Sequence, residues 1–200
     1  MSASSPVIVL LAAGEASRFG SLKQLAMIEG EPMVRGASRQ ALACGVPVLA
    51  VLGAGAERVA SALADLPLQT VVHEGWRDGL GSSLAAGVRA AQQAHPQSSG
   101  VLVMLADQPR LGTALLAHLL ALHAQSPTQI IATAQPGGAG PPALFPRSEL
   151  DALAETRGQH GAREWLRRDP ARVRLVDPTH CSADLRDIDT PDDLHRFTAS

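Results

Sequence analysis

Basic residues and glycines follow directly after the first apolar segment of the chain. The run Val7–Leu11 is unbroken and rich in β-branched residues, which is typical of a strand buried on both faces of a parallel sheet. Small residues come next, and then a short polar segment that carries Arg18 and Lys23. Backbone N–H groups can approach a phosphate closely in such a loop, and the cations add charge. This segment indicates an anion site, although a merely structural basic loop would have the same composition.

Two acidic segments of the sequence could bind a metal ion at that site. Asp107 follows the apolar run Gly100–Leu105 and precedes Pro109, and a carboxylate at the end of a strand suits Mg²⁺. Taken alone, Asp107 could equally cap the following helix. Asp187 and Asp189 form the second element, and alone they could simply place negative charge near the N-terminus of the last helix. Together with the basic loop, the two elements suggest Mg²⁺–nucleotide chemistry.

The sequence does not match two better-known phosphate motifs. Lys23 is neither preceded by Gly nor followed by Ser or Thr, so the loop is not a P-loop. A dinucleotide fingerprint fails after Gly14, where a second Gly should follow. Residues 53–58 do not match the dinucleotide fingerprint either, because Arg58 occupies the position of its third glycine. A hydride-transfer enzyme is therefore disfavoured.

Alternating apolar and helical segments must position these residues. Strands are predicted at Val7–Leu11, Val46–Leu52, Leu68–Val72, Gly100–Leu105, Gln129–Thr133 and Arg172–Val176, and helices at Met33–Cys44, Ala56–Ala64, Leu84–Ala94 and Leu111–Ala124. This alternation predicts an α/β fold with right-handed crossovers. We expect one doubly wound, Rossmann-like, three-layer domain over residues 1–200, with a mostly parallel central sheet.

Residue types also predict several local features. The segment 137–142 is rich in glycine and proline and is interpreted as an internal loop. Ser82 and Ser83 are favoured N-cap residues before Leu84–Ala94. Thr190 and Pro191 suit the N-cap and the first position of a terminal helix.

Bulk composition excludes several classes of protein. The chain has 200 residues, 46% of them hydrophobic, which is enough for a buried core without a disulfide or metal staple. The formal net charge of −2 argues against nonspecific nucleic-acid binding. No apolar run approaches the ~20 residues of a membrane span, so we expect a soluble, cytoplasmic protein without membrane contacts. Cys44 and Cys181 lack any ligand spacing and are expected to be free thiols.

Five segments resemble, in the same order, the motifs of one nucleotidyltransferase family. This MobA-like family includes the molybdenum cofactor cytidylyltransferases and guanylyltransferases. The matching segments are LAAGEASRFGSLK (11–23), WRDGLGSSL (76–84), LADQP (105–109), GAR (161–163) and DIDTPDDL (187–194). The opening Ala-Ala-Gly, LADQP and DIDTPDDL look most like the cytidylyltransferase branch. The resemblance implies a nucleotide-diphospho-sugar transferase type of fold in one MobA-like NTP transferase domain.

The resemblance also implies roles for individual residues. The loop Leu11, Ala12, Ala13 and Gly14 would bind the nucleoside, with Gly79, Ser82 and Ser83 helping to recognise base and sugar. Arg18 would neutralise the β- and γ-phosphates, and Lys23 would stabilise charge at the α-phosphate. Asp107 would bind Mg²⁺ with Asp189, or in reserve Asp187, as the second ligand. The catalytic set would be Lys23, Arg18 and Asp107.

The implied reaction is transfer of CMP from CTP to the terminal phosphate of molybdopterin cofactor, with release of pyrophosphate. GTP, another phosphorylated acceptor such as a sugar or polyol phosphate, and a non-catalytic nucleotide-binding or cofactor-chaperone protein remain alternatives. A molybdoenzyme or a cofactor-insertion protein would be a possible partner for such an enzyme. Pro141 stands where the family usually has His, and Gln159-His160 where it often has Asp-Arg. Base preference, acceptor identity, oligomeric state and the choice between Asp187 and Asp189 stay open.

Overall fold

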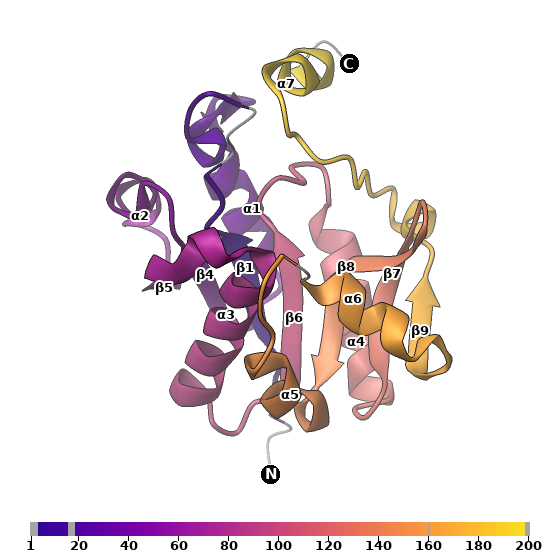
Figure 1. Cartoon of the computed structure of the whole chain (residues 1–200). Coiled ribbons are helices and arrows are strands. Elements are labelled where there is room, and N and C mark those ends of the chain that lie inside the picture. The colour runs from indigo at the N-terminus through magenta and orange to yellow at the C-terminus, as the bar shows by residue number, and fades with distance from the viewer. Residues whose placement is uncertain (1–3, 16–18, 160, 199–200) are drawn as a thin grey trace.

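A twisted sheet runs through the centre of the protein (Figure 1). The structure is a computed structural model that describes residues 4–15, 19–159 and 161–198. Within these residues the sheet has seven strands in the order β5-β4-β1-β6-β8-β7-β9. The strands are β1 (Val7–Ala12), β4 (Val48–Leu52), β5 (Gln69–Val72), β6 (Gly100–Leu105), β7 (Ile130–Gln135), β8 (Gly138–Pro146) and β9 (Val173–Val176). Only β8 runs antiparallel to its neighbours, so the predicted mostly parallel sheet is confirmed.

Helices cover both faces of this sheet, as a doubly wound fold requires. Successive residues of β1 point to opposite faces, so Ile8 and Leu10 pack on one side and Val7 and Val9 on the other. The first face is covered by α1 (Met33–Leu42), α2 (Ala56–Leu63) and α4 (Thr113–Gln125). The second face is covered by α3 (Leu80–Ala94), α5 (Leu150–Ala154) and α6 (Ala162–Arg168), which lie in front of the sheet in Figure 1. Each buried Val, Ile or Leu contributes about 1.5–3 kcal/mol of transfer free energy.

The prediction of a loop at 137–142 is wrong, because this segment forms most of β8. Its register with β7 jumps from the pair Ala132–Ala143 to the pair Thr133–Gly140. Pro141 and Pro142 therefore fall in the irregularity, where no ladder hydrogen bond is required of them. The Thr133 hydroxyl donates to the Pro142 carbonyl oxygen at 2.8 Å and holds the irregular region closed.

The prediction that Ser82 and Ser83 cap α3 is also wrong. The helix begins at Leu80, its N-cap is Gly79 at φ 109°, and both serines lie in the first turn. The last helix, α7 (Pro191–Thr198), begins as predicted. The Asp193 N–H donates to Thr190 Oγ1 at 3.1 Å, and the Thr190 N–H donates to Asp193 Oδ2 at 2.9 Å, which is a reciprocal capping box.

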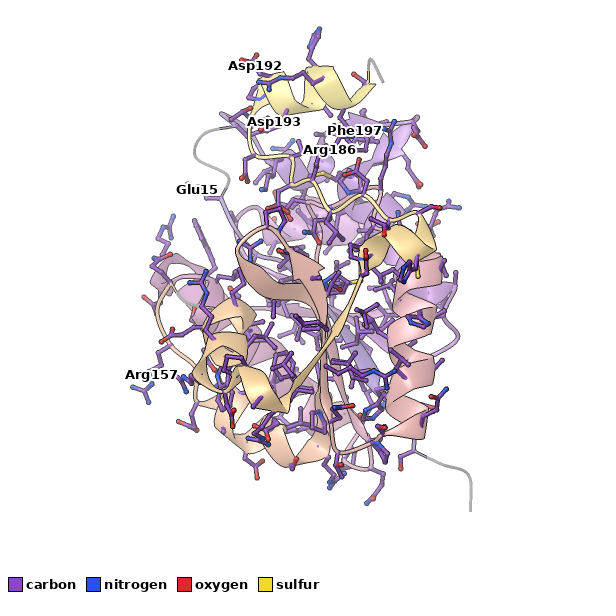
Figure 2. The ribbon with its side chains drawn as sticks, turned by 90° about the vertical axis from the view of Figure 1, so that its right-hand side faces the viewer. Glu15, Arg157, Arg186, Asp192, Asp193 and Phe197 are labelled. Carbon is purple, nitrogen blue, oxygen red and sulfur yellow. The ribbon has the colours of Figure 1, made fainter. Side chains whose placement is uncertain are left out.

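A small cluster of buried residues lies beyond the edge of the sheet and joins residues 28–33 to the C-terminal segment. It contains Ile28, Met33, Ile188 and Phe197. Phe197 lies on the side of α7 that faces the body of the protein (Figure 2). The remaining elements are the hairpin β2 (Met27–Ile28) and β3 (Glu31–Pro32), and the 3-10 turns η1 (Lys23–Leu25), η2 (Glu74–Asp78), η3 (Arg147–Glu149), η4 (Pro170–Arg172) and η5 (Pro178–Cys181).

Two further observations concern the chain as a whole. Among the residues that the structure describes, no helix is long and apolar enough to cross a membrane. Cys44 and Cys181 are both free thiols, as predicted.

Candidate active site

A cavity of about 400 Å³ lies at the carboxyl ends of β1 and β6. This is the edge at which open α/β sheets bind their ligands. Its walls come from the loop after β1, from η1, from the start of α3 and from the end of β6. They consist of Leu11, Ala13, Gly14, Glu15, Lys23, Gln24, Met33, Trp76, Arg77, Gly79, Leu80, Ser83, Leu105, Ala106, Asp107 and Gln159.

Lys23 brings the two predicted acidic elements together. Its ammonium donates to Asp107 Oδ2 at 2.7 Å and to Asp189 Oδ1 at 2.9 Å. The Lys23 side chain is only 13% exposed. Burial alone would lower the pKa of Lys23, but the charges and hydrogen bonds of Asp107 and Asp189 outweigh it, so the pKa is raised. The ammonium therefore stays charged at neutral pH and can neutralise an anion.

Asp107 is held at the end of β6 by the backbone around it. The Ile188 N–H donates to the Asp107 carbonyl oxygen at 2.9 Å, which fastens the C-terminal segment to this strand end. The second carboxylate oxygen, Oδ1, is buried and has no hydrogen-bond partner within the described residues. The alternative that Asp107 caps the next helix fails, because the N-cap of α4 is Gly112 and it has no side-chain cap bond.

The two carboxylates of the C-terminal segment have different surroundings. Asp187 Oδ1 accepts from Gln108 Nε2 at 2.9 Å, and Gln108 is completely buried. Burial and then the negative charge of Asp107 raise the pKa of Asp187. Asp189 is half-exposed and bonds to Lys23 instead. Asp189 therefore shares a cation with Asp107, whereas the carboxylate of Asp187 is held by an amide.

The donor set suits a metal that is also bound by a substrate. In the described part of the chain, no group of three or more His, Cys, Asp or Glu side chains is arranged to hold a metal ion alone. Mg²⁺ is commonly bound by one or two carboxylates together with substrate phosphates. Asp107 and Asp189 converge on one ammonium, and the unpartnered Oδ1 of Asp107 is a free hard ligand. These residues fit a divalent cation.

The loop after β1 forms one wall of the cavity. Leu11, Ala13 and Gly14 line it, whereas Ala12 is buried at the end of β1 and does not. The loop approaches β4 so closely that a Cβ atom on Gly53 would lie 2.5 Å from the Ala13 carbonyl oxygen. Arg18, the predicted partner of the β- and γ-phosphates, lies outside the described residues.

The predicted residues at the start of α3 divide into two groups. Gly79 and Ser83 line the cavity. Ser82 does not line it, because its hydroxyl donates to the Gly79 carbonyl oxygen at 2.7 Å and lies 3.0 Å from His73 Nε2. The structure thus brings Ser83, but not Ser82, to the site.

Several lining residues were missed by the sequence analysis. Trp76 was quoted within a motif but given no role, and the Arg77 guanidinium lies over its ring at 4.2 Å from the centroid. Only 2% of the residues are aromatic, so a tryptophan close to the glycines at positions 79 and 81 could have indicated that Trp76 lies at the site. Gln24 and Gln159 carried no signal of this kind.

A second cavity of about 580 Å³ adjoins the first. Leu80, Leu105, Asp107 and Gln159 line both, so Asp107 stands where the two meet. The other walls are Pro141, Gly161, Ala162, Arg163, Glu164, Arg167 and Asp187. Arg163 is oriented by a bond from its Nη2 to Gln135 Oε1 at 2.6 Å. The second cavity thus adds two cationic side chains next to the carboxylates.

A mostly parallel α/β sheet with a cation–carboxylate cluster between two cavities is the arrangement of a nucleotidyltransferase. A family model described as the MobA-like NTP transferase domain matches residues 8–173. The chain belongs to this family and is a nucleotidyltransferase, as predicted.

Two relatives and two solved structures are similar to the chain over nearly its whole length. Nicotine blue oxidoreductase of Paenarthrobacter nicotinovorans is 34% identical, in an alignment of 201 positions that covers 94% of each chain. Purine catabolism protein PucB of Bacillus subtilis is 28% identical over 193 residues, which cover 92% of each chain. The crystal structure of Rv0371c from Mycobacterium tuberculosis superposes with a TM-score of 0.83 at 28% identity, and covers 98% of this chain and 100% of that one. A complex of Rv0371c with manganese gives a TM-score of 0.77 at 26% identity, with the same coverage.

Proposed function

We propose that this nucleotidyltransferase transfers CMP from CTP to the terminal phosphate of a molybdopterin-type cofactor, with Mg²⁺ as its metal. The observation that carries the proposal is the contact of Lys23, which lines the first cavity, with both Asp107 and Asp189. This contact places a buried cation and two carboxylates where the strand ends meet. Such a set can hold a triphosphate and its metal at the same time.

The residues of the first cavity act on the nucleotide. Leu11, Ala13, Gly14 and Ser83 face the nucleoside. Lys23 donates to the α-phosphate and stabilises the charge that develops there, as a preorganised cation does. The acceptor phosphate attacks the α-phosphorus and pyrophosphate leaves. No protein nucleophile is required, because the attacking phosphate is already anionic.

The metal proposal rests on the fit of the donor set and on one relative. Asp107 and Asp189 would hold the ion, and the solved relative in complex with manganese supports a divalent cation. When bound, Mg²⁺ would neutralise the charge of the triphosphate and of the leaving pyrophosphate.

The second cavity suits the acceptor. It opens from Asp107, so a molecule inside it can present a phosphate to the first cavity. Arg163 and Arg167 line it and can bind further negative charge on the acceptor. Pro141 supplies an apolar wall in place of the usual histidine, so the acceptor is held there by shape and not by an imidazole.

Pyrophosphate release tests the proposal. We expect release with CTP, Mg²⁺ and molybdenum-loaded molybdopterin, and a loss of at least about 100-fold in Asp107→Asn. Asp192→Asn, an exposed aspartate in the first turn of α7, is the matched control and should retain full activity. Near-normal turnover in Asp107→Asn would contradict the metal role.

Substrate panels separate the alternatives. Release with GTP but not CTP would move the base assignment to guanine, and release only with a sugar or polyol phosphate would move the acceptor. Absence of release with every nucleotide, alongside nucleotide binding, would favour a cofactor-chaperone role. Oxidation of NADH or NADPH without pyrophosphate release would contradict the transferase proposal altogether.

A further inference from the structure

Gln24 makes two hydrogen bonds to the loop that faces the nucleoside. Its side chain is 3% exposed, and its Nε2 donates to the Ala12 carbonyl oxygen at 3.0 Å and to the Gly14 carbonyl oxygen at 2.5 Å. The other amide atom, Oε1, is buried and has no partner in the described part of the chain. The amide is therefore oriented to donate to the loop, and its own acceptor goes unused.

The carbonyl between these two is also occupied. The Ala54 N–H donates to the Ala13 carbonyl oxygen at 3.0 Å. Three consecutive carbonyl groups, those of Ala12, Ala13 and Gly14, thus accept from the protein itself. Within the described residues no acceptor bonds to the N–H groups of Ala13 or Gly14. Ala13 and Gly14 line the cavity, so among the described residues this wall combines unpaired N–H donors with carbonyl acceptors that are already paired.

A surface of donors distinguishes the bases by their Watson–Crick edges. Cytosine presents two adjacent acceptors, N3 and O2, on this edge. Guanine presents two adjacent donors, N1–H and the N2 amine, beside a single acceptor, O6. Uracil places an N3–H donor between its two acceptors. Two neighbouring backbone N–H groups therefore match the Watson–Crick edge of cytosine, whereas guanine presented by the same edge would bring donors against donors and leave them unpaired.

We propose that Gln24 is a specificity-determining residue of this enzyme, which selects cytosine over guanine by occupying the loop carbonyls of Ala12 and Gly14. The inference rests on the proposed function, since it concerns the base of the nucleotide in the same site. Gln24 acts through the loop and need not touch the base. Sites that hydrogen-bond a substrate group reject an analogue lacking it, because the buried partners are then left unpaired.

The variant Gln24→Met tests this selection. Methionine keeps the length and most of the volume of the side chain but cannot donate, so the carbonyl of Gly14, which lines the cavity, loses its partner and becomes available to guanine donors. CTP and GTP are titrated into the wild-type protein and the variant, each with Mg²⁺, by isothermal titration calorimetry. We expect the wild type to prefer CTP, and the ratio of the two affinities to fall at least about tenfold in the variant. Gln93→Met, which removes an exposed amide on α3, is the control and should leave the ratio unchanged.

A nucleotide analogue tests the same inference on the unaltered chain. The triphosphate of 3-deazacytidine replaces the N3 acceptor by C–H and keeps the shape of the base. We expect it to bind the wild type roughly tenfold more weakly than CTP. This measurement does not depend on whether Gln24→Met folds.

The outcomes separate this inference from the proposed function. If Gln24→Met weakens CTP and GTP equally, or if 3-deazacytidine triphosphate binds as well as CTP, the specificity role is wrong while nucleotide transfer stands. A wild-type preference for GTP overturns the role as well. Failure of the wild type to bind any nucleotide overturns the proposed function, and the inference with it.

Discussion

Asp187 and Asp189 are separated by one residue, yet they contact different groups. Asp189 bonds to Lys23 beside Asp107, whereas Asp187 accepts from the buried amide of Gln108. The contacts favour Asp189 as the second metal ligand and give Asp187 a supporting place beside it. Sequence alone could not decide this, because both residues match the same short motif.

This difference predicts unequal effects of two conservative substitutions. Asp189→Asn should lower kcat/KM by at least about 100-fold, since it removes a proposed ligand, and Asp187→Asn by about tenfold, as for an outer-shell partner. Initial rates measured over a range of Mg²⁺ concentrations check both values, with circular dichroism to confirm folding. A larger loss in Asp187→Asn would exchange the two roles.

Trp76 offers an optical signal for nucleotide binding. It lines the first cavity, while the other tryptophan, Trp165, lies on α6 with its Nε1 bonded to Thr156 Oγ1. A base or phosphate entering the cavity changes the surroundings of Trp76 alone. We expect CTP with Mg²⁺ to change the emission of the wild type and of Trp165→Phe, but not that of Trp76→Phe. A response that survives in Trp76→Phe would place the nucleotide elsewhere.

At the scale of the elements, close approach between β1 and β4 shapes the nucleoside loop. A Cβ on Gly53 would lie 2.5 Å from the Ala13 carbonyl oxygen and 2.7 Å from Trp76 Cβ. The Ala13 backbone and the packed side chain of Trp76 cannot easily move aside to make room for such a Cβ atom. Glycine is therefore required at this strand end for packing, and not as part of a dinucleotide motif.

Two glycine substitutions should have opposite effects on stability. Gly53→Ala should lower the free energy of unfolding by about 1–3 kcal/mol through overpacking, and should weaken CTP binding. Gly36→Ala, inside α1, meets no atom nearer than 3.7 Å and has an ordinary helical backbone, so it should add about 0.4–1 kcal/mol. Urea denaturation measures both. A neutral Gly53→Ala would show that the loop can retreat from β4.

The elements that were predicted correctly have strong periodicity or a clear strand signal. Residues 7–12 and 100–105 are continuous apolar runs, and both form central strands at the predicted places. The segment 138–146 was missed because its glycines and prolines are typical of loops. Its strand character comes from β6 and β7 on either side, and its prolines are tolerated by the register shift opposite Ala132 and Thr133. The presence of these neighbouring strands depends on the tertiary fold and cannot be predicted from local composition.

The candidate site shows the same division. Lys23 and Asp107 could be found from residue type and from their position after apolar strands. Their contact with each other and with Asp189 joins residues 84 and 166 positions apart, which only the folded sheet brings together. Gln24 and Gln159 could not be found, because an amide has the same appearance in a sequence whether it lies in a loop wall or on the surface.

At the scale of the whole molecule, the candidate site and the buried histidine His123 lie at opposite ends of the parallel strands. The candidate site lies at the carboxyl ends of β1 and β6. His123 of α4 lies near the other edge, where its Nε2 is 3.1 Å from Ser99 Oγ just before β6 begins. His123 is 2% exposed, and its Nδ1 has no partner within the described residues. A change at His123 should therefore act on stability without acting on the site.

This separation predicts a pH dependence of folding that belongs to His123. Burial lowers the pKa of His123, and its hydrogen bond with Ser99 offsets only part of this effect. In the unfolded chain the histidine titrates near its usual pKa of about 6.5. Below that pH the unfolded state binds a proton that the folded state does not, so stability is full above about pH 6.5 and falls as the pH drops toward the folded-state pKa.

Urea denaturation at about pH 7.5 and at about pH 5.5 should show this loss in the wild type and a smaller one in His123→Leu. His118→Gln, an exposed histidine of the same helix, is the control and should keep the wild-type slope. Equal slopes in the wild type and His123→Leu would assign the pH dependence to other groups.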